Sequence, residues 1–231
     1  MEQLNSFVKR NWFPLFVIGI VGLSMVLRFY NYEGRWGFAH DQAHGAIIGR
    51  YAAEHFKLPL VGPFSSAGPF QTGGEWYWFI MMATSFYSDL LLTPWVVLTF
   101  SYVVFVFLLI IVGKELVNKP FGIIVGLLAA VSTAQIAQSV NLTNQSPLAV
   151  MALFAIWAAI RYAKTQSLVS LFFLGLSIGI SPTIHLQGIG LFFLIPVTLA
   201  LTGLPSNIKL LALALGVIIP FIPLLVFDVQ F

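Results

Sequence analysis

The stretch FAHDQAHGAIIGRYAAEHFKLPLVGPFSS, residues 38–66, is the one long polar segment in an otherwise apolar chain. Its charged side chains recur at helical spacing and face a more apolar side, which predicts an amphipathic helix lying in a membrane interface. We expect this helix to open at Asp41 and to end at Leu58–Pro59. The charged stripe is Arg50, Glu54 and Lys57; the apolar stripe roughly opposite is Ile48, Ala52 and Phe56; the flank is His44, Tyr51 and His55.

The residues that follow predict a loop and then a second helix. GPFSSAGPFQTGG, residues 62–74, is rich in Gly, Pro and Ser, and this composition predicts little regular structure. GEWYWFIMMATSFY, residues 74–87, predicts a helix whose Trp76, Tyr77 and Trp78 suit the headgroup level of a bilayer. The segment therefore has two juxtamembrane helices joined by a loop.

The rest of the chain has the composition of a membrane protein. Of 231 residues, 59% are hydrophobic and 8% are charged, whereas a soluble domain carries about 25% charged residues. The mean hydropathy is +0.94. The apolar runs predict an all-α polytopic fold, one transmembrane domain over residues 1–231, with about seven spans. These runs lie near residues 12–27, 90–112, 121–138, 147–161, 168–183, 187–202 and 208–227.

The charged residues favour one orientation in the membrane and argue against nucleic-acid binding, and the absence of Cys excludes disulfides and thiolate metal sites. With the N-terminus in the cytoplasm, every basic residue outside the first long loop falls on the cytoplasmic side, as the positive-inside rule requires. We therefore expect a multi-pass protein of the plasma (inner) membrane, with residues 28–89 extracytoplasmic. The net charge of +3 is not clustered in a basic stripe, so nucleic acid is not an expected partner. Without Cys, disulfides and thiolate metal sites are excluded.

Asp41 is the most interesting acid in the extracytoplasmic loop. As a helix N-cap it accepts hydrogen bonds from backbone N–H groups, which is a structural role. As a carboxylate in a cleft it can also act as a general base toward an acceptor hydroxyl or amine. His44 lies three residues on, and His185 lies at the same side of the membrane. Asp41, His44 and His185 are therefore candidate ligands of a divalent metal, although they do not complete a site by themselves.

Other polar residues on that side are candidate substrate-binding groups, each with a structural alternative. Glu75 opens the second helix, where it compensates the helix dipole or serves as a second carboxylate. Arg28 and Arg35 lie just outside the first span, where a guanidinium binds phosphate or, for Arg28, snorkels to the interface. Asn144, His185 and Gln187 complete the candidates.

These residues together resemble a known superfamily. The Arg28–Phe29 pair after the first span, the segment HDQAHGAIIGRYAAEH and the segment LPLVGPFSSAGPFQTGGEWYW resemble the GT-C polytopic glycosyltransferases, in particular the protein mannosyltransferase-like and aminoarabinose transferase-like members. The resemblance implies an N-terminal module of seven spans with two juxtamembrane helices. It also implies a polyprenyl-phosphate-linked sugar donor, an unidentified acceptor and inverting transfer, with Asp41 as general base. The leaving phosphate would need a cation or metal, for which Arg28, Arg35, His44 and His185 are available.

The chain departs from that superfamily in two respects. Many relatives carry a further acid in the second outer loop, where NLTNQSP offers Asn144 and Gln145. Relatives also continue through further spans, so activity of residues 1–231 alone stays open. The alternative hypothesis is a non-catalytic membrane protein that binds lipid phosphate or serves as a scaffold partner. A small transporter is disfavoured, because the spans lack paired charges and an internal repeat.

Overall fold

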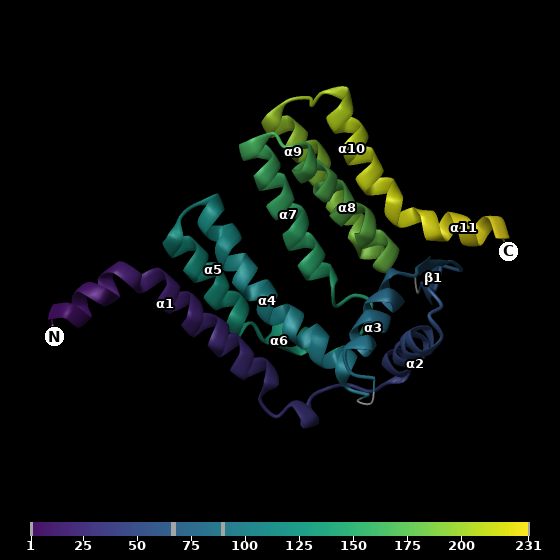
Figure 1. Ribbon diagram of the computed structural model, residues 1–231, viewed down its shortest axis with the longest axis horizontal. Helices are drawn as coiled ribbons and strands as arrows, with labels where there is room; N and C mark the ends of the chain where they lie inside the picture. The colour runs from purple at the N-terminus through teal and green to yellow at the C-terminus, as the bar shows by residue number, and fades with distance from the viewer. Residues whose placement is uncertain (1, 66–67, 89–90, 231) are drawn as a thin grey trace. The chain divides into compact units, whose positions relative to one another are not determined.

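The protein is almost entirely helical and divides into two compact units. The computed structural model describes residues 2–65, 68–88 and 91–230 (Figure 1). The first unit contains the described residues of 1–37 and 95–142, and the second those of 38–94 and 143–231. The single domain expected over residues 1–231 stays a prediction. Asp89 and residue 90, the predicted boundary between the long loop and the second span, lie outside the described residues.

Within the part of the chain that the structure describes, four helices are long and apolar enough to cross a membrane: Arg10–Phe29, Thr93–Leu116, Leu148–Thr165 and Asn207–Gln230. A fifth candidate is the pair Lys119–Val131 and Thr133–Ser139, which is bent by 62°. Two shorter apolar helices, Leu168–Ile184 and Leu186–Thr202, coincide with the other two predicted spans. The all-α, membrane-spanning class is supported, while the full number of seven spans stays a prediction.

The first unit is built on α1 (Glu2–Phe29), η1 (Tyr32–Gly34), α4 (Thr93–Leu116), α5 (Lys119–Val131) and α6 (Thr133–Ser139). A kink lies at Asn11 of α1, whose φ of −111° and ψ of 16° are not helical. Pro14 follows one turn later and cannot supply the backbone N–H that a helix interior needs, which accounts for the kink. The apolar part of α1 therefore starts as a separate straight segment.

The predicted span over residues 121–138 is broken in the structure, and Arg28 supplies the physical reason. Its Nη2 donates to the carbonyl oxygen of Ala129 at 3.2 Å, and its Nη1 donates to that of Ala130 at 3.1 Å. In a continuous helix these carbonyls would accept N–H groups four residues further on. Ser132 then starts α6 by accepting the backbone N–H of Gln135. One buried side chain thus ends one helix, and a serine begins the next.

The second unit contains a bundle of apolar helices next to a small polar segment. The bundle comprises α7 (Leu148–Thr165), α8 (Leu168–Ile184), η2 (Leu186–Phe193), α9 (Leu194–Thr202), α10 (Asn207–Ile218), η3 (Ile219–Phe221) and α11 (Ile222–Gln230). Figure 1 shows α8 beside both α7 and α10. Buried residues of these three helices, among them Tyr162, Leu174 and Leu213, form its apolar core.

Glycines allow α8 and α10 to approach closely. A Cβ at Gly175 would collide with the carbonyl oxygen of Leu213, and a Cβ at Gly179 with that of Val217. Small residues spaced four apart are a common means of helix contact in membranes, because apolar surface alone gives no preference for protein over lipid. The spacing of Gly175 and Gly179 thus fixes the position of α8 against α10.

Gly179→Ala is expected to lower the free energy of unfolding by about 1–3 kcal/mol, because the added methyl group must push two backbones apart. Gly22→Ala is the matched control: nothing lies within 4 Å of a Cβ there, so the better helix propensity of Ala is expected to stabilise α1 slightly. Thermal unfolding in detergent measures both. Equal shifts in the two variants would contradict the close contact.

The polar segment contains α2 (His40–His55), β1 (Val61–Phe64), β2 (Gln71–Gly73) and α3 (Glu75–Phe86). Both predicted helices are present. The expected loop without regular structure is wrong in part, since β1 and β2 pair antiparallel with Val61 opposite Gly73 and Phe64 opposite Gln71. Proline is tolerated in this short ribbon because the Pro63 carbonyl still accepts a hydrogen bond from the Thr72 hydroxyl at 3.0 Å. Residues 66 and 67, which follow β1 in the sequence, lie outside the described residues.

The predicted faces of α2 are partly wrong. The helix ends at His55 rather than at Leu58–Pro59, because Phe56 adopts a left-handed backbone with φ of 50°. Lys57 therefore does not continue the charged stripe, and Phe56, which ends the predicted apolar stripe, lies just beyond the helix and is 90% exposed. The buried face is formed by small and polar residues: Gln42, Gly45, Ala46, Gly49 and Ala52. Gly45 faces Trp76 and Ile80, and Gly49 faces Ile80 and Met81, so α2 and α3 advance in the same direction along their contact.

Candidate functional site

Asp41 lies in the first turn of α2 and is not its N-cap. The N-cap is Ala39, whose backbone N–H donates to Gln42 Oε1 at 3.1 Å. Asp41 is exposed and, among the described residues, has no hydrogen-bond or ion-pair partner. The exposed rings of His40 and His44 stack on each other with centroids 6.2 Å apart. The structure therefore presents Asp41 to solvent at the start of a helix.

Both candidate arginines are engaged by backbone carbonyls of the first unit. Arg28 is 0% exposed and also donates to Ser24 Oγ at 2.8 Å, so snorkelling to an interface is wrong for this residue. Arg35 Nη1 donates to the carbonyl oxygens of Leu27 and Tyr30, at 2.8 and 2.9 Å. These are the unpaired carbonyls at the end of α1. The two guanidinium groups thus satisfy carbonyls at helix ends, while Arg28 Nε and Arg35 Nη2 are buried without a hydrogen-bond partner among the described residues.

Glu75 is a buried carboxylate without a hydrogen-bond partner. It is 8% exposed at the start of α3, and neither carboxylate oxygen is hydrogen-bonded within the part of the chain that the structure describes. The Thr183 hydroxyl lies beside it but donates to the carbonyl of Ile180 at 2.8 Å. Burial raises the pKa of the Glu75 carboxyl above its ordinary value, because the charged form loses its water. An orphan acid of this kind is typical of a functional site.

Gly73 explains how the carboxylate reaches this position. A Cβ on Gly73 would occupy the place of Glu75 Oε2 and would also press on Thr183 of α8. Glycine in β2 therefore lets the side chain of Glu75 fold back between the ribbon and α8. The sequence pattern Gly73–Gly74–Glu75 signalled a helix start, but it did not indicate that the acid is enclosed.

A cavity of about 430 Å³ lies beside Gly73 and Thr183, the two residues that cover the Glu75 carboxylate, and Glu75 itself is not part of its wall. Its volume falls within the roughly 300–1,000 Å³ of sites that bind small molecules. Gly73 and Thr183, which both lie against Glu75, are part of its wall. Most of the remaining wall is apolar, with polar groups on one side; the lining residues are Phe70, Gln71, Thr72, Gly73, Pro182, Thr183, Leu186, Ile189, Phe192, Phe221 and Leu224.

Three of the predicted site residues, Asn144, His185 and Gln187, lie at the end of α8. In sequence they are next to cavity residues of the same segment, such as Leu186. Asn144 Nδ2 donates to the carbonyl oxygen of Ile184 at 3.1 Å, and the backbone N–H of Gln187 donates to His185 Nδ1 at 3.2 Å. Partial burial lowers the pKa of the His185 imidazole. The neutral ring then carries its proton on Nε2, which lies 3.2 Å from the side-chain amide of Gln145. The 3.2 Å distance is to the amide nitrogen of Gln145; with the amide turned over, its oxygen accepts a hydrogen bond from His185 Nε2–H.

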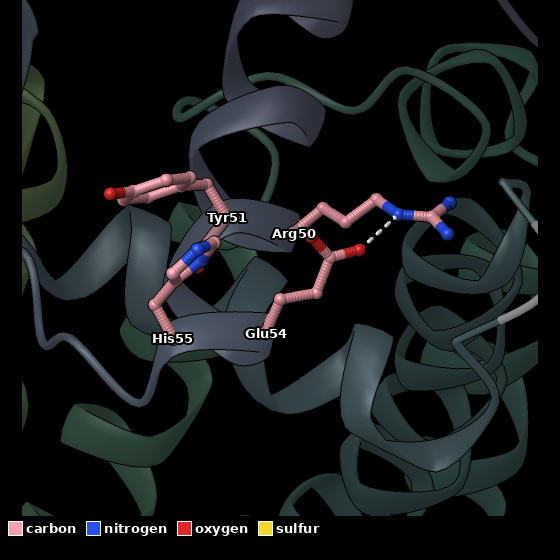
Figure 2. A network of polar contacts seen from close by, with 4 residues as sticks. All are labelled: Arg50, Tyr51, Glu54 and His55. Atoms are coloured by element: carbon pink, nitrogen blue, oxygen red, sulfur yellow. Dashed lines mark hydrogen bonds and ion pairs between the residues drawn. The ribbon is translucent and has the colours of Figure 1, made fainter.

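The charged stripe of α2 forms a local network (Figure 2). Arg50 Nε donates to Glu54 Oε1 at 2.9 Å, and both side chains are about half exposed. The rings of Tyr51 and His55 stack with centroids 4.0 Å apart. An exposed ion pair at i, i+4 contributes about 0.3–0.5 kcal/mol, so this network stabilises the helix and shows no sign of a ligand site.

The metal candidates are not brought together. Within the described ranges, no group of three His, Asp or Glu side chains has the arrangement that holds a metal ion. Asp41 and His44 stay on α2, whereas His185 is engaged by Gln145 and Gln187. The site that does assemble has Glu75 and Thr183 at its centre. Sequence reasoning missed Thr183 and the pairing of Gln145 with His185, because no local pattern marks a contact between residues so far apart in the chain.

Comparisons with protein-family models, with curated proteins and with solved structures found no match for this chain.

Proposed function

We propose that this protein is the membrane module of an inverting glycosyltransferase, which transfers a sugar from a polyprenyl-phosphate donor to an extracytoplasmic acceptor. The observation that carries the proposal is the buried Glu75 carboxylate, unpaired among the described residues and covered by Gly73 and Thr183, which in turn line a cavity with a mostly apolar wall. The apolar wall would contact the first isoprene units of a lipid donor, and a carboxylate would accept hydrogen bonds from the hydroxyl groups of a sugar. The apolar helices support a place in a membrane.

In the proposed reaction the acceptor hydroxyl oxygen attacks the anomeric carbon of the donor. The bond from that carbon to the phosphate oxygen breaks, and polyprenyl phosphate leaves with the bonding electrons. Asp41, the candidate general base, removes the proton of the attacking hydroxyl. Its exposure supports this role, because an acceptor from the aqueous side can reach it. Glu75 would hold the sugar through its hydroxyl groups.

One observation favours the alternative, a non-catalytic protein that binds lipid phosphate or serves as a scaffold. Arg28 and Arg35 both donate to backbone carbonyls, and the nitrogens that keep no partner among the described residues, Arg28 Nε and Arg35 Nη2, are buried. The lowered pKa of His185 leaves an N–H donor without a full charge. In this reading the cavity binds a prenyl chain, and Asp41 only compensates the dipole of α2.

Asp41→Asn is expected to lower sugar transfer from polyprenyl-phosphate donors by about 10²–10⁴-fold, because an amide cannot accept the proton. Membranes containing each variant are supplied with radiolabelled donor, and the labelled product is counted. Glu33→Gln, at an exposed acid of η1, is the matched control and should leave transfer unchanged. Equal transfer by wild type and Asp41→Asn would remove Asp41 from the mechanism. Donor binding without any transfer by the wild type would favour the alternative.

A further inference from the structure

A second opening lies in the first unit, and none of the candidate site residues named above lines it. It is a groove of about 450 Å³ between α1 and α5. Its wall contains no polar side chain; the main contributors are Trp12, Phe16, Gly19 and Leu23 of α1 and Ile123 and Leu127 of α5. Such a groove offers nothing to a sugar or a nucleotide. Its chemistry fits a hydrocarbon chain.

The depth of the groove is set at Gly19. Nothing lies within 4 Å of a Cβ built on Gly19, although α5 packs against α1 on either side of this level. Phe16 is 55% exposed and Leu127 is 42% exposed, so large apolar side chains border an open space. Gly22, one turn further, is also open but does not line the groove.

Two positive charges lie over the ring of Phe13, which follows the groove residue Trp12 in α1. The ammonium nitrogens of Lys114 and Lys119 lie 5.4 and 5.9 Å from the ring centroid of Phe13, the neighbour of Trp12. Both lysines are exposed, and neither has an acidic partner among the described residues. Two like charges at one ring repel each other, and an anion between them would relieve that repulsion. The aromatic contact holds both groups beside Phe13, one residue along α1 from Trp12 in the groove wall.

We propose that this groove and the two lysines form a binding site for an anionic glycerophospholipid. One acyl chain lies along Gly19 between α1 and α5, and the phosphate is held between Lys114 and Lys119. Basic pockets between membrane helices are a known means of binding anionic headgroups. A second copy of α1 is a poorer occupant, because it would bring the same positive end to the same place. The proposal is independent of sugar transfer.

The test is lipid retention by the purified protein after exchange into detergent with equal amounts of phosphatidylglycerol and phosphatidylcholine. Native mass spectrometry gives the ratio of the two bound lipids. The wild type is expected to prefer phosphatidylglycerol by about tenfold. Lys114→Gln/Lys119→Gln should reduce the ratio to about one. Lys164→Gln/Lys209→Gln removes the same charge elsewhere, with Lys209 again near an aromatic ring, and should keep the preference.

A second pair of variants tests the groove itself. Gly19→Leu places a side chain in the open space and should reduce the retention of both lipids severalfold, whereas Gly22→Leu should not. Neither substitution meets a neighbouring atom at its Cβ, so both variants are expected to fold, which far-UV circular dichroism checks. Unchanged lipid ratios in the Lys114/Lys119 variant, or equal retention by the two glycine variants, would overturn the proposal.

Discussion

Arg28→Ala is expected to lower the free energy of unfolding by about 3–5 kcal/mol, a larger loss of stability than is expected for Gly179→Ala. The guanidinium makes hydrogen bonds to Ala129, Ala130 and Ser24, and all of these groups are buried. Removing it strands two carbonyls at the end of α5 and leaves a void where one of the largest fully buried side chains lies. Thermal or denaturant unfolding in detergent measures the loss.

Two comparisons separate this role from a general effect of removing charge. Arg50→Ala removes an exposed guanidinium from the Arg50–Glu54 pair and should cost less than about 0.5 kcal/mol. Arg28→Lys keeps the positive charge but not the planar guanidinium, so the lysine should hydrogen-bond only some of the buried carbonyls. Its loss of unfolding free energy should lie between those of Arg28→Ala and Arg50→Ala. If Arg28→Ala were no more destabilising than Arg50→Ala, the helix-ending role of Arg28 would be refuted.

Glu75→Gln is expected to stabilise the fold at pH 7 by about 1–2 kcal/mol while impairing binding of a sugar donor. The stabilisation follows from burial, because the neutral amide avoids the loss of hydration that the unpaired carboxylate suffers. The loss of binding rests on the proposed function. A residue whose replacement stabilises the fold but weakens the activity is retained for function. Unfolding curves of Glu75→Gln measure its stability, and a donor-binding assay measures its activity.

The pH dependence of stability gives this prediction a further test. Since the folded-state pKa of Glu75 is raised, the folded protein takes up a proton before the unfolded chain does as the pH falls. Wild-type stability should therefore rise as the pH falls from 7 toward the ordinary pKa of a glutamate, about 4.3. The advantage of Glu75→Gln should shrink over the same interval. Glu54→Gln, at an exposed acid, should show neither the gain at pH 7 nor this convergence.

The sequence of the 38–88 segment predicted its two helices well and its environment poorly. The helices over 40–55 and 75–86 follow from local pattern, and both are present. The end of α2 was misplaced, because the left-handed turn at Phe56 has no strong signal in a residue type that seldom adopts it. The ribbon of β1 and β2 was missed, because Gly and Pro mark a turn whether or not its flanks pair.

The sequence predicted which residues belong to the candidate site, but it did not predict their burial or their contacts with one another. Asp41, Glu75, Asn144, His185 and Gln187 were all identified as polar groups in mostly apolar surroundings. Which of them is enclosed could not be predicted, because burial depends on what packs against the residue. Glu75 is enclosed by Thr183, and Asp41 is left exposed.

The amino-acid sequence by itself determined an all-α chain with apolar helices long enough to cross a membrane and one polar segment, since hydropathy and helical periodicity are local properties of a chain. Tertiary structure alone decided that Arg28 ends α5, that Glu75 is buried without a partner, and that an open groove lies at Gly19. Arg28 meets Ala129 across 101 residues of sequence. Contacts of this kind form only when segments distant in the sequence pack together. That packing decides whether a polar residue caps a helix, is buried without a partner or stays exposed.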